Sequence, residues 1–171
     1  MDAAALQALA DRQAITDLIY RYARSMDRID AELGYSIWHE DSVADYGEIF
    51  QGTGRGFIDF VCGTHRGLIV HQHLIGNILI DLEGDRAGTE SYFAANLRLQ
   101  AGEGVKQISV WGRYIDHWSR RAGRWGIDKR VTLVDFDELR DVTPMGQQTR
   151  GSRDPADPSY AALRTYPASA G

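Results

Sequence analysis

Apolar residues repeat at helical spacing through the first part of the chain. They stand at Leu6, Leu9, Ile15, Leu18, Ile19, Tyr22, Ala23 and Met26. This is the i, i+3, i+4, i+7 pattern of an amphipathic helix. The pattern predicts one long helix over residues 6–26 that buries the apolar stripe against a core.

Two shorter helices are expected before residue 67. Asp30 is a suitable N-cap for a helix through Leu33, Ile37 and Trp38, with the acidic stretch 39–41 as its exit. Glycines then bracket a further stretch in which three apolar residues share one helical face, namely Phe57, Phe60 and Val61. A third helix is predicted there.

Beyond residue 67 the apolar period changes from about 3.6 to about 2, which is the period of strands. The turns EGDRAG and RRAGR separate runs that we predict to be strands, at 69–82, 86–100, 105–119 and 124–136, with a short one near Val43 to Tyr46. Helices followed by a meander indicate an α+β domain, with about three N-terminal helices packed on a curved antiparallel sheet that encloses a pocket. From residue 140 the chain is rich in Pro, Gly, Ser, Asp and Arg, so we predict a domain at 1–139 and an extended or partly disordered tail at 140–171.

Composition narrows the class of protein. The 171 residues suffice for one domain that buries roughly 70% of its unfolded surface. The net charge of −5, from 24 acidic and 19 basic residues without a run of like charge, argues against nucleic acid and a polybasic membrane contact. Neither a signal peptide nor about 18 consecutive apolar residues occur, so a cytoplasmic protein is expected. Cys62, the single cysteine, is expected to be a buried hydrophobe.

Side-chain alternation divides the predicted strand 69–82 into two faces. One face carries His71, His73, Ile75, Asn77 and Leu79, and the other carries Val70, Leu74, Ile78, Ile80 and Leu82. The second is a packing face. The first mixes imidazoles and an amide with aliphatic groups, which is typical of a pocket wall, although a bulge would change this assignment. The alternative for each histidine is a hydrogen-bonded structural role.

Two further candidates lie on the first predicted helix. Asp27 follows the apolar stripe directly and comes four residues after Ala23, so its carboxylate can flank the buried face; a solvated helix end is the alternative. Tyr22 falls within the stripe, where its ring can pack while its hydroxyl reaches a cavity.

The last two predicted strands alternate aromatic and charged residues. Tyr114 belongs to this pattern, and Arg130 is a candidate for holding an anionic or carbonyl oxygen, with cross-strand ion pairing at the surface as the alternative. No Walker A loop, G-x-S-x-G elbow or H-E-x-x-H motif occurs. His71 and His73 form an H-x-H pair that could chelate a metal, but the spacing shows no third ligand, so we expect neither a metal nor another cofactor.

Three segments together resemble the SnoaL-like group of the nuclear transport factor 2-like superfamily. They are RQAITDLIYRYARSMDRID, HQHLIGNILIDLEGDRA and GRYIDHWSRRAGRWGIDKR, and the likeness covers about residues 8–137. The group includes scytalone dehydratase, hexachlorocyclohexane dehydrochlorinase and bile acid 7α-dehydratase. The resemblance implies a cone-shaped, cystatin-like α+β barrel and a homodimer that associates through the outer face of its sheet.

The resemblance also implies roles for individual residues. In dehydratase-like and dehydrochlorinase-like members an aspartate that closes the first helix orients a strand histidine, which removes a proton; Asp27 and His73 match this pair. Tyr22 matches a tyrosine near the leaving oxygen, and either Arg130 or Arg121 matches an arginine used in some members. Asn96 stands where bile-acid-dehydratase-like members have an acidic residue, so that particular reaction is in doubt.

The expected function is therefore cofactor-free proton abstraction by a lyase or isomerase acting on a hydrophobic, for example aromatic or polycyclic, small molecule. His73, Asp27 and Tyr22 are the expected catalytic residues. The expected substrate contacts are His71, Asn77, Arg130, Asn96 and Tyr114. The alternative is a domain without catalysis, either a small-molecule-binding protein or a structural partner like the β subunits of aromatic-ring dioxygenases.

Overall fold

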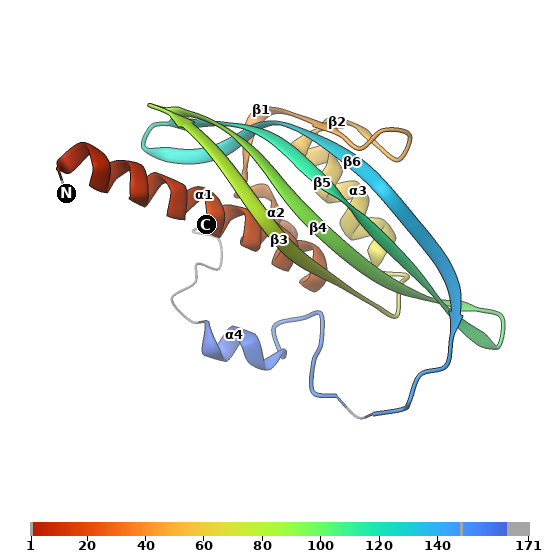
Figure 1. Cartoon of the computed structure of the whole chain (residues 1–171). Helices are drawn as coiled ribbons and strands as arrows, with labels where there is room; N and C mark the ends of the chain where they lie inside the picture. Colours follow the sequence, from red (N-terminus) through yellow and green to blue (C-terminus); the bar gives the residue numbers. More distant parts are fainter. Residues whose placement is uncertain (1, 148, 164–171) are drawn as a thin grey trace.

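The first helix forms where the apolar pattern predicts it. In the computed structural model, which describes residues 2–147 and 149–163, α1 spans Ala3–Arg28 (Figure 1). The side chain of Asp2 caps its start by accepting a hydrogen bond from Ala5 N at 2.8 Å, and Ile29 ends it in the left-handed region with φ 54°. The stripe is buried or partly buried from Ile15 onward, with Ile15 and Ile19 completely inaccessible to solvent, but its first two members, Leu6 and Leu9, are 54% and 58% exposed.

The two short helices are also present. α2 spans Ala31–Tyr35 and begins at the predicted cap, where the Asp30 side chain accepts a hydrogen bond from Leu33 N at 3.0 Å. α3 spans Gly54–His65 and is capped by the Thr53 hydroxyl. It buries Phe57 and Val61, but Phe60 is partly exposed.

The predicted continuation of the second helix through Ile37 and Trp38 was wrong. Trp38 opens the strand β1 (Trp38–Asp45), which includes the acidic stretch that we had expected to be a helix exit. The reason is pairing with a distant strand: Ile127 N donates to Ile37 O at 2.9 Å, and Trp38 lies in register with Ile127. A local pattern cannot reveal this partner.

The strands form one six-stranded sheet. The others are β2 (Gln51–Thr53), β3 (Val70–Glu83), β4 (Arg86–Ala101), β5 (Gly104–Arg121) and β6 (Arg124–Val142). Their order is β2-β1-β6-β5-β4-β3, and every neighbouring pair is antiparallel except β1 and β6, which are parallel. The meander β3 to β6 is therefore confirmed, and two strands extend it beyond β6: β1, which is parallel to β6, and β2, which is antiparallel to β1.

The sheet curves, and the N-terminal helices occupy its inner side (Figure 1). α1 lies beside β3, and α3 packs behind the sheet within its curve. The core between these layers contains large side chains from both, including Ile19, Ile58, Phe93, Trp118 and Ile127. The α+β class with a cystatin-like arrangement is confirmed. Within the described residues, no helix is long and apolar enough to cross a membrane.

The C-terminal part departs in detail from expectation. β6 continues to Val142, beyond the expected end at residue 136, and a short helix, α4, spans Pro158–Ala162. Arg24 Nη1 donates to Ser159 Oγ at 3.1 Å, and Arg153 Nη1 donates to the carbonyl oxygen of His65 at 2.8 Å, so this segment contacts α1 and α3. The division at residue 139 stays a prediction, and residues 148 and 164–171 lie outside the described part.

A buried carboxylate joins the first half of α1 to the sheet. Asp11 is 5% exposed, and its Oδ1 accepts hydrogen bonds from Trp125 Nε1 at 2.9 Å, from Arg120 Nη1 at 2.6 Å and from Gln7 Nε2 at 3.1 Å. Since a buried donor that loses its partner keeps its desolvation cost, this carboxylate should matter for stability.

We predict that Asp11→Ala lowers the free energy of unfolding by about 2–3 kcal/mol, because it leaves Trp125 Nε1 and Arg120 Nη1 without their acceptor, although Arg120 keeps its contacts with Asp85. Urea denaturation followed by tryptophan fluorescence measures this loss. Asp17→Ala is the matched control, since Asp17 accepts a hydrogen bond from Gln13 of the same helix at an exposed site. Equal losses in both variants would show that Asp11 does not anchor the helix.

Candidate active site

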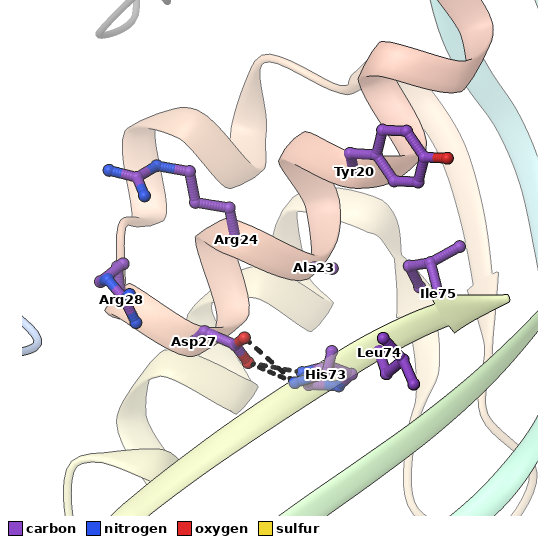
Figure 2. Close-up of a pocket in the computed structure, with 8 residues that line it drawn as sticks. All are labelled: Tyr20, Ala23, Arg24, Asp27, Arg28, His73, Leu74 and Ile75. Atoms are coloured by element: carbon purple, nitrogen blue, oxygen red, sulfur yellow. Dashed lines mark hydrogen bonds and ion pairs between the residues drawn. The ribbon is translucent and has the colours of Figure 1, made fainter. Parts of the chain in front are cut away.

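The end of α1 meets the edge strand β3 at Asp27 and His73. His73 Nδ1 lies 2.7 Å from Asp27 Oδ1, and the backbone N–H of His73 donates to both carboxylate oxygens at 3.0 Å (Figure 2). The two side chains are mostly buried, at 9% and 14% exposure. The two sequence candidates, 46 positions apart, therefore form a hydrogen-bonded pair.

The hydrogen bond to Asp27 determines which ring nitrogen of His73 carries the proton. An ionised carboxylate only accepts hydrogen bonds, so the Nδ1 of His73 is the protonated nitrogen of the neutral ring. Its Nε2 is then left with a free lone pair. Two contacts from Asp27, to the ring and to the backbone of the same residue, hold the imidazole in one orientation.

A β-bulge in β3 corrects the predicted strand face. The pairing with β4 shifts between Ile75 and Ile78. Before the shift His71, His73 and Ile75 are the more buried positions, and after it Ile78, Ile80 and Leu82 are. The prediction that Asn77 and Leu79 share the face of the histidines was wrong, since both are exposed; so are Val70 and Leu74, which we had placed on the packing face.

An apolar cavity of about 290 Å³ lies between α1, α3 and the sheet, and His73 forms part of its wall. Its apolar lining is Met26, Ile49, Phe57, Phe60, Val61, Phe93, Ala95, Leu97, Val110 and Val134. Its polar lining is Tyr22, Tyr46, Thr64, His65, His73, Tyr114 and Thr132. His73 also borders a second, open groove of about 340 Å³ between α1 and β3, which Asp27 lines as well (Figure 2). His73 thus lies between the apolar cavity and the outer groove, whereas Asp27 lines only the groove of these two.

Two phenols face the cavity and bond to one another. Tyr22 Oη and Tyr46 Oη are 2.7 Å apart. Burial raises the pKa of each phenol above its ordinary value, and most strongly that of Tyr22. Both therefore stay protonated, and only one of them can donate to the other; Tyr114, a third phenol of the lining, also hydrogen-bonds to Tyr22.

Behind these phenols lies a fully buried ion pair. Arg130 Nε and Nη2 donate to the two oxygens of Asp116 at 2.6 and 2.7 Å, and both side chains are 0% exposed. The guanidinium carbon lies 4.1 Å from the ring centres of Tyr22 and Tyr114. Burial alone would lower the pKa of Arg130, but Asp116 raises it well above its ordinary value, so the charge persists. Our alternative for Arg130 was cross-strand ion pairing at the surface: the cross-strand pairing is confirmed, because Asp116 lies opposite Arg130 in register, but the surface location was wrong.

Neither of the two candidate arginines lines the cavity, and they lie in different surroundings. Arg121 lies on the surface, where it pairs with Asp41 at 2.7 Å and with Asp128. Arg130 instead packs against the phenols that line the cavity, although it is itself a layer behind the wall. Tyr114 lines the cavity as expected, whereas Asn96 does not: it lies in register with Gln72 and Ser109 on the other side of the sheet.

His65 was missed by the sequence analysis. It ends α3, lines the cavity and packs edge-on against His71, with ring centres 4.4 Å apart. The pKa of His65 is lowered to about 4, mainly by burial and to a smaller extent by the neighbouring His71, so the ring is neutral near pH 7. Its Nδ1 is buried without a hydrogen-bond partner in the described part of the chain. No periodicity indicates that the end of α3 packs on β3. Tyr46, which directly follows β1, was also missed, because no local pattern indicates that this end of β1 reaches the cavity.

Asp27, His71 and His73 offer ligand atoms within 4.8 Å of one another, which is compatible in distance with a metal ion. His71 Nε2, which is 3.9 Å from Asp27, contacts the carbonyl oxygen of Met26 and must donate its proton there. A protonated nitrogen is not a metal ligand, so the lone pair of His71 is on Nδ1, which is buried without a hydrogen-bond partner in the described part of the chain. The expectation that no metal is required stays a prediction.

Comparisons with known proteins agree on the family and the fold. The profile of the SnoaL-like domain matches residues 7–131. No curated protein matches the sequence.

Solved structures match over most of the chain. A hexachlorocyclohexane dehydrochlorinase is 20% identical with a TM-score of 0.74, covering 83% of this chain and 99% of its own. A scytalone dehydratase-like protein from Novosphingobium aromaticivorans is 22% identical with a TM-score of 0.68, covering 83% and 97%. From the same organism, a nuclear transport factor 2-like protein with a cystatin-like fold is 26% identical with a TM-score of 0.64, covering 78% and 87%.

We predict that Asp116→Asn lowers the free energy of unfolding by about 3–5 kcal/mol, because it leaves the guanidinium of Arg130 charged, buried and unpaired. Chemical denaturation measures the loss. Asp135→Asn, which breaks the exposed pair with Arg113, is the control and should change stability little. A small loss for Asp116→Asn would mean that water reaches Arg130.

We predict that stability falls as the pH is lowered from about 6.5 toward 4. The folded-state pKa of His65 is about 4, below its ordinary value, and burial also lowers the pKa of His71. The unfolded chain therefore binds more protons in this window, and unfolding is favoured as the pH drops.

Denaturation at a series of pH values checks this. His65→Gln should remove about 1–2 kcal/mol of the loss, a figure reduced because the ring is partly exposed. His117→Gln, at an exposed position of β5, should leave the curve unchanged. An identical slope in wild type and His65→Gln would contradict the assignment.

Proposed function

We propose that this chain, which belongs to the SnoaL-like domain family, is a cytosolic, cofactor-independent lyase or isomerase that removes a proton from carbon in a hydrophobic small molecule. The observation that carries the proposal is the His73 imidazole, fixed by Asp27 at the wall of an apolar cavity. The fold is shared with a dehydrochlorinase and a dehydratase-like protein, which supports the reaction class.

The first step is general-base catalysis. Nε2 of His73 takes the C–H proton, and the C–H electron pair forms a new C=C bond as the neighbouring C–X bond breaks and X leaves with its electrons. In an isomerisation the proton returns to another carbon instead. The carboxylate of Asp27 stabilises the imidazolium formed, and a positioned base of this kind contributes about 10² to 10⁴ in rate.

The phenols supply hydrogen-bond donors to the cavity. Tyr22, Tyr46 and Tyr114 all line it, and the O–H that the contacts among them leave over binds a carbonyl or leaving oxygen that gains negative charge. Arg130, directly behind Tyr22, stabilises that charge at 4.1 Å from the ring centre. By stabilising the developing negative charge, these donors contribute a part of the rate enhancement that the base alone does not supply.

Cavity size limits the substrate. A volume of about 290 Å³ is at the lower end of the roughly 300–1,000 Å³ typical of small-molecule sites. It favours a compound of one or two rings over a larger polycyclic one. The many aromatic and aliphatic wall residues favour an apolar ring system with one or two polar substituents.

Association into a homodimer remains part of the proposal. On the outer face of the sheet Leu74, Ala94, Trp111 and Phe136 lie in register across four strands. Leu74 and Phe136 are 69% and 56% exposed, so the row offers an apolar surface that a second copy would cover.

We predict that the protein opens the ring of 5-nitrobenzisoxazole, a general probe for a base in an apolar site. The base removes the C3 proton while the N–O bond breaks, and a coloured nitrophenolate forms without any co-reactant. His73→Ala and Asp27→Asn should each lower kcat/KM by about 10² to 10⁴ while circular dichroism shows an intact fold.

His117→Ala, which removes an exposed imidazole on β5, should keep the wild-type rate. A wild-type rate no higher than that of His73→Ala would refute the base assignment. If the cavity still bound an apolar dye in that case, the non-catalytic binding domain would be the better description.

A further inference from the structure

A second cavity lies at the corner where the end of α1 meets the sheet. It measures about 580 Å³ and is lined by Asp27, Arg28, Val70, His71, Gln72, Asn96, Arg98, Gln107 and Arg140. None of these residues lines the apolar cavity. The lining is polar and carries three arginines against one aspartate, so this cleft is chemically the opposite of the proposed active site.

The sheet register explains how the cationic groups come together. Val70, Arg98, Gln107 and Arg140 face one another across the strands β3, β4, β5 and β6. Cross-strand partners lie on the same face of a sheet. Arg98 and Arg140 therefore flank Gln107, one on each side.

The acceptor oxygens of Gln107 and Asn96, which lie next to these arginines, already accept hydrogen bonds from other side chains. Gln107 is 6% exposed; its Oε1 accepts from Arg98 Nε at 3.0 Å, and its Nε2 donates to Asn96 Oδ1 at 3.1 Å and to Ser109 Oγ at 3.0 Å. Ser109 Oγ donates to the same oxygen of Asn96 at 2.7 Å. The Asn96 oxygen thus accepts two hydrogen bonds, which is its full capacity.

Donors remain at the surface of the cleft. The terminal nitrogens of Arg98, the guanidinium of Arg140 and the amide nitrogen of Asn96 have no acceptor in the described part of the chain, and no described carboxylate pairs with either arginine. Asp27, the one acidic group of the lining, already accepts hydrogen bonds from His73. The cleft therefore presents positive charge and free N–H groups to whatever enters it.

We propose that this cleft binds the oxyanion group of a small molecule, a phosphate or a carboxylate, between Arg98 and Arg140. Guanidinium groups match both anions with paired N–H donors. The Asn96 amide nitrogen adds a neutral donor, whereas the charge of Arg28 at the rim is offset by Asp157, 3.8 Å from its Nε. The site does not depend on the chemistry proposed for His73.

Isothermal titration calorimetry of the full chain with inorganic phosphate, at constant ionic strength kept with chloride, tests the site. Arg98→Gln and Arg140→Gln should each weaken phosphate binding at least about tenfold, the loss expected for one charge-assisted contact. The matched control is Arg113→Gln on β5, because Arg113 is already paired with Asp135 and Glu90. It should bind phosphate as the wild type does.

Arg98→Gln removes a hydrogen bond to Gln107 and could disturb the local structure. Arg140→Gln does not remove that bond, so it tests phosphate binding independently. A parallel titration with acetate separates the two anions, and tighter binding of acetate than of phosphate would assign a carboxylate ligand. No binding of either anion, or equal weakening by the Arg113→Gln control, would overturn the proposal. His73→Ala should bind phosphate normally, so failure of the proposed catalysis and failure of this site can be told apart.

Discussion

The junction between the end of α1 and the edge strand β3 is the interaction on which the rest of the structure depends. An edge strand has backbone N–H groups without a strand partner. Here the Asp27 carboxylate accepts the N–H of His73, and the Met26 carbonyl accepts the ring N–H of His71. The helix thus closes the open side of the sheet, and the cavity exists because this side is closed.

The same junction creates the proposed catalytic geometry. The carboxylate that satisfies the backbone of β3 also fixes the imidazole of the same residue. The base is therefore held by structural contacts that would be needed without any reaction. Asp27 and His73 are accordingly mostly buried, although both border the outer groove and His73 also borders the apolar cavity.

Burial sets the charge of the other groups around the cavity. His65 and His71 are kept neutral because their desolvation lowers each pKa, and the phenols of Tyr22 and Tyr46 are kept protonated because burial raises theirs. Arg130 is charged in the same interior only because Asp116 neutralises it at close range. The cavity thus combines neutral bases and neutral donors with one compensated charge behind them.

Much of the architecture was determined by the sequence itself. The helical stripe, the change to period two and the glycine turns predicted α1, α3 and the four long strands, because these patterns reflect local backbone preference and one-sided burial. The place of Asp27 after the stripe and the parity of His73 made each of them a candidate for the pocket wall. The family resemblance suggested that the two pair and added their proposed roles.

Tertiary structure alone decided the rest, because it depends on pairing between distant segments. The bulge in β3 moved Asn77 outward, and the parallel pairing with β6 turned Trp38 into a strand residue. Packing of α3 and β1 brought His65 and Tyr46 to the cavity, and the register of four strands aligned Arg98 with Arg140. Local periodicity contains no record of which remote strand or helix supplies the partner, so none of these placements could be derived from the sequence.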